Sequence, residues 1–140
     1  MKRLLVTMLL AGAISMGACG TKSQNSASSK KSLEAAGYKV TAYSATEAKA
    51  LITGLKYDGY DLHDAIYAEK GEEANKDIML AFYFSSIDQA EKFMSDNENF
   101  NLNLMYDYGR THLGENLTQK VGMHNNVAYV GSETSFIAAF

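Results

Sequence analysis

The segment that most constrains the fold of this chain is an unbroken run of seven apolar residues, Ile78–Phe84. A continuous apolar run of this length is typical of a central β-strand that is buried on both faces of its sheet. We therefore expect Ile78–Phe84 to be the most buried strand and Phe82 to be a core residue. Leu51, Ile52 and Phe93 should pack against the sheet that contains this strand.

Other segments have the pattern of strands. Residues 38–43 are β-prone and alternate apolar side chains on one face, and Asp64–Glu69 is a second stretch of this kind. A charged loop over residues 70–76 predicts a hairpin between Asp64–Glu69 and the central run. Residues 119–131 predict two short strands around Asn125-Asn126, because asparagine tolerates the positive φ of a tight turn.

Three serines each follow a predicted strand and precede an apolar helical stripe: Ser44, Ser86 and Ser132. Ser44 with Glu47 and Ser86 with Gln89 have the spacing of a capping box. The three stripes that mark the expected helices are Ala48, Leu51, Ile52 and Leu55; Ala90, Phe93 and Met94; and Phe136, Ile137 and Phe140.

In chain order these elements are β-α-β-β-α-β, with a hairpin as the last β unit, followed by a short C-terminal helix. Right-handed crossovers fold such an order into two helices on one face of an antiparallel sheet. The predicted fold class is therefore α+β, a ferredoxin-like sandwich.

The stretch 97–118 is the hardest to assign. Its apolar residues alternate with asparagine and aspartate over nine positions, which is strand spacing. Asparagine is a poor strand former, however. We favour an edge strand, and a helix extension or a mobile loop remains open.

The composition indicates one small globular domain, since the 140 residues are 46% hydrophobic and 21% charged. With 13 basic and 16 acidic side chains the net charge is −3, which argues against nucleic acid as the main partner. The single cysteine excludes a disulfide framework and any CxxC zinc or redox site.

The N-terminus has the layout of a secretory signal peptide, with basic residues at Lys2 and Arg3 and an apolar stretch over Leu4–Ile14. This stretch is too short to span a bilayer core, which takes about 20 helical residues. The following Met16-Gly17-Ala18-Cys19 resembles the lipobox of bacterial lipoproteins, which is an aliphatic residue, two small residues and an obligatory cysteine. Met16 stands where leucine is commoner.

The resemblance implies cleavage between Ala18 and Cys19, a diacylglyceryl group on the Cys19 sulfur and often N-acylation by a fatty acid such as palmitate. The protein would then be held by its acyl chains on the extracytoplasmic face of the cell membrane. The alternative is an ordinary signal peptide with a chance cysteine near the cleavage point.

Removal of residues 1–18 takes Lys2 and Arg3 with it and leaves 11 basic against 16 acidic residues, a charge of −5. An acidic body is mildly repelled by an anionic membrane, so the acyl chains must hold it there. Residues 20–32 are rich in serine, asparagine and lysine with no apolar period, which predicts a flexible tether. The expected organisation is a signal peptide over 1–18, a lipidated Cys19 with its tether over 19–32, and one domain over 33–140.

The polar cluster Asp58–Asp64 is the densest in the chain, and a metal site could use Asp61, His63 and Asp64. The cluster lacks the ligand order of an EF-hand loop, and the three histidines, His63, His112 and His124, have no recognised metal spacing. A turn between a helix and a strand favours Asp and Gly for its own reasons. We therefore expect a turn here, with no metal and no other cofactor.

Nine tyrosines and no tryptophan invite a search for an aromatic recognition surface. Sheet packing accounts for those in predicted strands. Four others lie in turns or unassigned segments and are the candidates for a binding surface: Tyr57, Tyr60, Tyr106 and Tyr108.

Two classes of function remain open. The first is a non-catalytic, lipid-anchored domain that binds a protein or small ligand in the envelope, or supports a complex there. The second is a small envelope enzyme or metal-binding protein centred on Asp61, His63 and Asp64, with His112 or His124 brought in by the fold. We expect the first, because the sequence contains no recognisable catalytic set.

Overall fold

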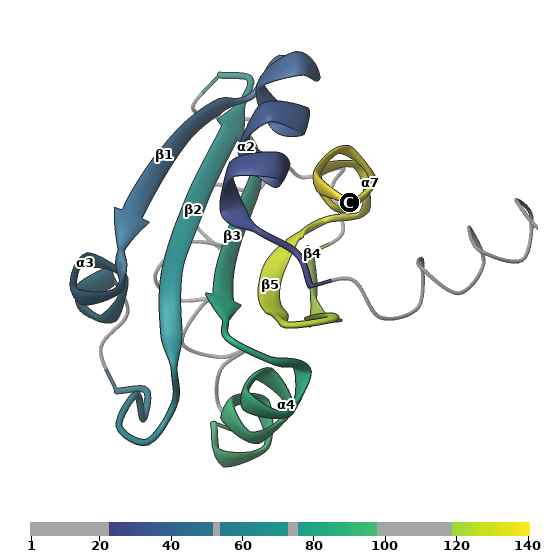
Figure 1. Ribbon diagram of the computed structural model, residues 1–140. Helices are drawn as coiled ribbons and strands as arrows, with labels where there is room; N and C mark the ends of the chain where they lie inside the picture. Colours follow the sequence, from purple (N-terminus) through teal and green to yellow (C-terminus); the bar gives the residue numbers. More distant parts are fainter. Residues whose placement is uncertain (1–22, 52–53, 73–75, 98–118) are drawn as a thin grey trace, which may run out of the picture.

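The structure is a computed structural model that describes residues 23–51, 54–72, 76–97 and 119–140. These residues form a mixed α+β fold with a five-stranded antiparallel sheet and four helices (Figure 1). Across the sheet the strand order is β1-β2-β3-β5-β4. The strands are β1 (Lys39–Ser44), β2 (Leu62–Lys70), β3 (Asp77–Phe84), β4 (Gln119–His124) and β5 (Val127–Ser132), and the helices are α2 (Ser26–Ala35), α3 (Ala45–Leu51), α4 (Ile87–Asp96) and α7 (Glu133–Ala139).

Strand β3 is the centre of the fold, as its apolar run predicts. All eight of its residues are buried, and it lies between β2 and β5. Successive side chains of a strand point to opposite faces of the sheet. Leu80, Phe82 and Phe84 therefore belong to one core cluster, and Met79, Ala81 and Tyr83 belong to the other.

Helices cover both faces of the sheet. Helices α3 and α4 pack on the face of Phe82 through Ala48, Ala90 and Phe93. Helices α2 and α7 lie on the opposite face, where Leu33 and Ala139 are buried (Figure 1). The expectation of two helices on one face is thus met by α3 and α4, and a second helical layer covers the other face. Leu51 packs against the first cluster as expected, and Ile52 lies outside the described residues.

The order of the strands differs from the ferredoxin-like prediction. That arrangement places the third strand between the first two, whereas here β1 pairs antiparallel with β2, for example Ala42 with Ile66. The direct pairing of β1 with β2 extends over six residues, from Lys39–Glu69 to Ser44–Asp64, and takes the place of a crossover. Strand β3, which is buried on both faces, is instead flanked by β2 and β5.

The serine-rich segment expected to be a flexible tether is largely a helix, so the tether prediction is wrong for residues 26–32. Asn25 caps α2 at its start by accepting a hydrogen bond from Ser28 N at 2.8 Å. At the other end Gly37 has φ +91°, and the Tyr38 and Gly37 amides donate to Leu33 O and Glu34 O at 3.0 Å. This is the Schellman arrangement that ends many helices.

The three predicted serine caps are confirmed. Ser44 accepts from Glu47 N at 3.3 Å and its own N–H donates to the Glu47 carboxylate at 2.7 Å, a complete capping box. Ser86 accepts from Gln89 N at 3.3 Å, and Ser132 accepts from Ser135 N at 2.9 Å.

Both predicted hairpins are present. Lys70 pairs with Asp77 where β2 turns into β3, and His124 pairs with Val127 across the β4–β5 turn. Asn125 has φ +51°, a positive value that asparagine tolerates and that the sequence predicted for this turn. The expected edge strand over residues 97–118 falls almost wholly outside the described residues, and Asn97 directly follows α4.

Replacing Phe82 by Ala should lower the free energy of unfolding by about 3–5 kcal/mol, because the ring is fully buried and its removal leaves a cavity. A urea melt of each protein measures the change. Ile137→Ala is the matched control, since Ile137 is 70% exposed and its truncation should change stability by less than about 0.5 kcal/mol. A loss below about 1 kcal/mol for Phe82→Ala would contradict this account of the core.

Candidate functional site

Tyr57 and Tyr60, two of the four candidate recognition tyrosines, pack around one aromatic ring of α4. The Tyr60 ring meets Phe93 edge to face with centroids 5.5 Å apart, and the Tyr57 ring lies 6.0 Å from Phe93. Phe82 and Phe84 contact the same ring. Both tyrosines are partly buried, so their rings take part in the packing of the α4 face.

The Tyr60 hydroxyl donates a hydrogen bond to the Asp96 carboxylate, and the Lys92 ammonium lies 5.8 Å from the centre of its ring. The hydrogen bond to Asp96 raises the pKa of Tyr60 to about 12. Burial raises the pKa of Tyr57 to about 12 as well. A binding role for these two tyrosines stays a prediction, and Tyr106 and Tyr108 lie outside the described residues.

Asn97 holds the loop before Tyr57 in place. Its side-chain oxygen accepts from Lys56 N at 2.7 Å, and its Nδ2 donates to Lys56 O at 3.1 Å and to Phe93 O at 2.9 Å. Because Asn97 is buried, these bonds are protected from competing water. The side chain therefore joins a loop without regular structure to the end of α4.

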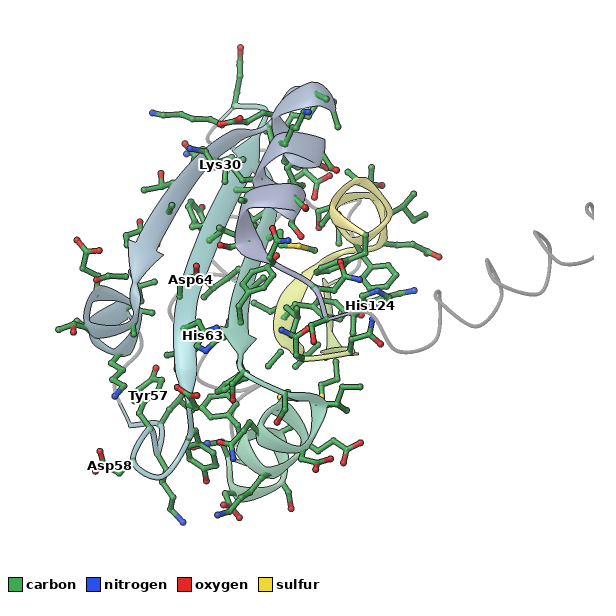
Figure 2. All side chains as sticks on the ribbon, in the orientation of Figure 1. Lys30, Tyr57, Asp58, His63, Asp64 and His124 are labelled. Carbon is green, nitrogen blue, oxygen red and sulfur yellow. The ribbon has the colours of Figure 1, made fainter. Side chains whose placement is uncertain are left out.

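The candidate metal residues Asp61, His63 and Asp64 do not come together at one point. The register of β2 against β3 shifts between Leu62 and Asp64, which is a β-bulge at His63. A bulge reverses the alternation of side chains along its strand. His63 is consequently exposed beside Asp61, 3.8 Å from its carboxylate, while Asp64 turns towards α2 (Figure 2).

His124 does not join that cluster. His124 lies on β4, where its ring packs on Phe140 at 4.7 Å and on Phe136 at 5.5 Å. His112 lies outside the described residues. Within the described ranges no group of three or more His, Cys, Asp or Glu side chains is placed to hold a metal ion. The geometry therefore gives the metal hypothesis no support.

A set of polar side chains lies between α2 and the sheet. The Ser26 hydroxyl donates to Asp64 Oδ2 at 2.7 Å. Further under the helix, three atoms are buried and make no hydrogen bond of normal geometry with the described residues: Ser29 Oγ, Asp64 Oδ1 and the Tyr83 hydroxyl. Burial raises the pKa of Tyr83, the nearby Ser29 hydroxyl lowers it in part, and the charge of Asp64 raises it. The face under α2 is thus apolar at Leu33 and polar at Tyr83.

A second buried polar cluster lies at the start of β3. The Asp77 carboxylate accepts hydrogen bonds from Tyr38 at 2.6 Å and from Ser132, the residue that caps α7. Burial, followed by the hydrogen bond and the charge of Asp77, raises the pKa of Tyr38. Gly131 leaves room for α7 beside β3, since a Cβ there would stand 2.6 Å from Ser135 Oγ on α7 and 2.8 Å from Ile78 O on β3. The cluster ties the beginning of β1, β3 and α7 to one another.

A third contact fixes the first described residues. Gln24 N donates to Asn126 Oδ1 at 2.7 Å, and Asn126 Nδ2 donates to Gln24 O at 3.0 Å and to Phe84 O at 2.8 Å. Sequence reasoning assigned Asn126 to a turn and missed this role. We call this set of three bonds the Asn126–Gln24 clasp.

The predicted lipidation site, Cys19, and the residue before its cleavage point, Ala18, lie outside the described residues. Among the residues that are described, no helix is long and apolar enough to cross a membrane. Comparisons with protein-family models, curated proteins and solved structures found no match to this chain.

Replacing Tyr83 by Phe should leave the protein as stable as before or up to about 1 kcal/mol more stable, because it removes a buried hydroxyl that makes no normal hydrogen bond with the described part of the chain. Urea melts of the two proteins measure the difference. Tyr38→Phe is the matched control, since its hydroxyl bonds to Asp77 and its removal should destabilise by about 1–3 kcal/mol. A clear loss for Tyr83→Phe would show that its hydroxyl is well paired.

Stability should fall as the pH rises from 10 towards 12. The pKa values of Tyr38, Tyr57, Tyr60 and Tyr83 in the fold all lie above 10.0, their ordinary value. Unfolded tyrosines lose protons near 10 while these four stay protonated, so rising pH favours the unfolded state. Urea melts across this range, alongside tyrosinate absorbance, test the expectation. Tyr60→Phe should make the loss shallower, and an unchanged pH dependence in that variant would contradict the argument.

Proposed function

We propose that this chain is a bacterial lipoprotein whose small domain acts without catalysis, by binding a partner or supporting a complex in the cell envelope. The observation that carries the proposal is the tetrapeptide Met16-Gly17-Ala18-Cys19 directly after a short apolar stretch. The only cysteine of the chain stands at the position where the lipobox of this class requires one. Its thioether-linked diacylglyceryl group would supply the membrane anchor.

The physics of anchoring supports the same proposal. A single acyl chain gives marginal membrane affinity, whereas two chains hold a protein durably, at about 0.8 kcal/mol per buried CH₂. The mature charge of −5 gives the body no electrostatic attraction to anionic lipid. Acyl chains on Cys19 would therefore have to provide the attachment.

The non-catalytic part of the proposal rests on how the polar side chains of the described residues are used. Asp77 and Asp64 accept hydrogen bonds from neighbouring hydroxyls within the fold. His63 and Asp61 form a contact on the surface. The partner we propose is a protein or a small ligand of the envelope, and nucleic acid is disfavoured by the negative charge.

Cys19→Ala should abolish lipid attachment and cleavage before residue 19, because the thioether has no sulfur to form on. Bacterial cells expressing each protein are given a tagged fatty acid, and the label on the protein is compared on a gel. The variant should remain as a precursor held by its uncleaved apolar segment, or be cut elsewhere and released. Ser15→Ala is the matched control, since it lies outside the lipobox and should keep the label. A wild-type protein without label, or a Cys19→Ala variant with equal label, would show that the protein is simply secreted.

A further inference from the structure

Gln24, near the start of the described residues, is fixed to the folded domain by hydrogen bonds. At the Asn126–Gln24 clasp, one side-chain amide satisfies both backbone polar groups of Gln24 at 2.7 and 3.0 Å. Asn126 is only 2% exposed, so water competes poorly for these bonds. The second amide hydrogen of Asn126 binds Phe84 O at 2.8 Å, which ties the clasp to the end of β3.

The residues after Gln24 reinforce that attachment. Asn25 caps α2, Ser26 bonds to Asp64 on β2, and Leu33 is fully buried on the sheet. From Gln24 onwards the chain is therefore part of the folded body. The length between the lipid-bearing residue and the body is five residues from Cys19 to Gln24, instead of the fourteen that separate Cys19 from Leu33.

We propose that one end of the sheet, where β3 ends and β5 begins, faces the membrane. The Asn126–Gln24 clasp causes this orientation, because it fixes the chain at that end. The inference rests on the proposed lipidation of Cys19. Five extended residues reach at most about 18 Å, so Gln24 is held within that distance of the lipid-bearing residue. The partner of this end is the headgroup layer of the bilayer.

The opposite end of the sheet lies beyond that reach. Strand β3 runs from Asp77 to Phe84, and its eight residues span about 23 Å at about 3.3 Å per residue. Glu72 follows the end of β2, where Lys70 pairs with Asp77, and so lies at the end of the sheet opposite Phe84. The turn at the proximal end, His124–Val127, carries no carboxylate, but the exposed Asp61 lies at the same end, where Ser85 N donates to Asp61 O. The lipid on Cys19, and not surface charge, would therefore have to hold this end at the bilayer.

The absence of tryptophan from the sequence allows a direct test of the orientation. Ser85→Trp places a tryptophan, the fluorescence donor, next to Phe84 at the proximal end. Glu72→Trp places the same donor at the distal end, and both positions are exposed. Each full-length chain is processed in bacterial cells, purified, and reconstituted in phosphatidylcholine vesicles that contain a dansyl-labelled headgroup lipid. Energy transfer to the dansyl group should be several-fold more efficient for Ser85→Trp than for Glu72→Trp.

Two further variants test the cause of the orientation. A ten-residue Gly-Ser spacer between Lys22 and Ser23 is inserted before the first described residue and has a root-mean-square length of about 16–19 Å. It should remove the difference between the two donors. Asn126→Ala should remove the hydrogen-exchange protection of the Gln24 amide, whereas Asn97→Ala, which deletes a similarly bonded asparagine elsewhere, should leave that protection in place.

Each outcome bears on a separate claim. The intact mass of the reconstituted protein reports whether Cys19 carries lipid, and an unmodified cysteine overturns the proposed function together with this orientation. If Cys19 is lipidated but the two donors transfer energy equally, the orientation alone is wrong. A difference that survives the spacer would show that surface affinity orients the body, and a freely exchanging Gln24 amide in the wild-type protein would show that no clasp forms. Either result overturns the inference and leaves the lipid anchor standing.

Discussion

The burial of β3 on both of its faces is the constraint on which the rest of this structure depends. Its apolar side chains must be shielded from water on two sides, so one layer of helices is not enough. Helices α3 and α4 cover the face of Phe82. The face of Tyr83 is covered by the C-terminal helix α7 and by α2, which the sequence composition alone did not mark as part of the domain.

Helix α2 fills this role with few apolar residues. Only Ser29 and Leu33 are buried within it, so apolar burial contributes little to its attachment. Polar contacts supplement it, through Ser26 to Asp64 and through the clasp that precedes the helix. The buried polar atoms under α2 that make no normal hydrogen bond with the described residues act in the opposite direction, because a buried polar group without a partner costs free energy. Its docking is therefore a balance of small contributions, in contrast to the apolar packing of α4.

Two asparagines, Asn97 and Asn126, each attach a segment without regular structure to the core. Asn97 binds the backbone N–H and C=O of Lys56, and Asn126 binds those of Gln24, with each also donating to the carbonyl of a neighbouring element. A side-chain amide offers a donor and an acceptor in one plane, so it substitutes for a missing strand neighbour. Segments without regular structure are thereby attached to the core. If Cys19 carries lipid, the Asn126 contact also sets how far the body stands from the membrane.

The sequence by itself determined the features whose signals are local. The apolar run of β3, the caps at Ser44, Ser86 and Ser132, and the tight turn at Asn125 each depend on a few neighbouring residues, and each is present. The ends of α2 were also encoded locally, by Asn25 at its start and Gly37 at its end, but a search for apolar periodicity passes over a helix with a single buried leucine. Tertiary structure alone decided the strand order, the bulge that separates His63 from Asp64, and the pairing of Gln24 with Asn126 across 102 positions. These depend on which distant surfaces remain uncovered once the sheet has formed, and no short stretch of sequence carries that information.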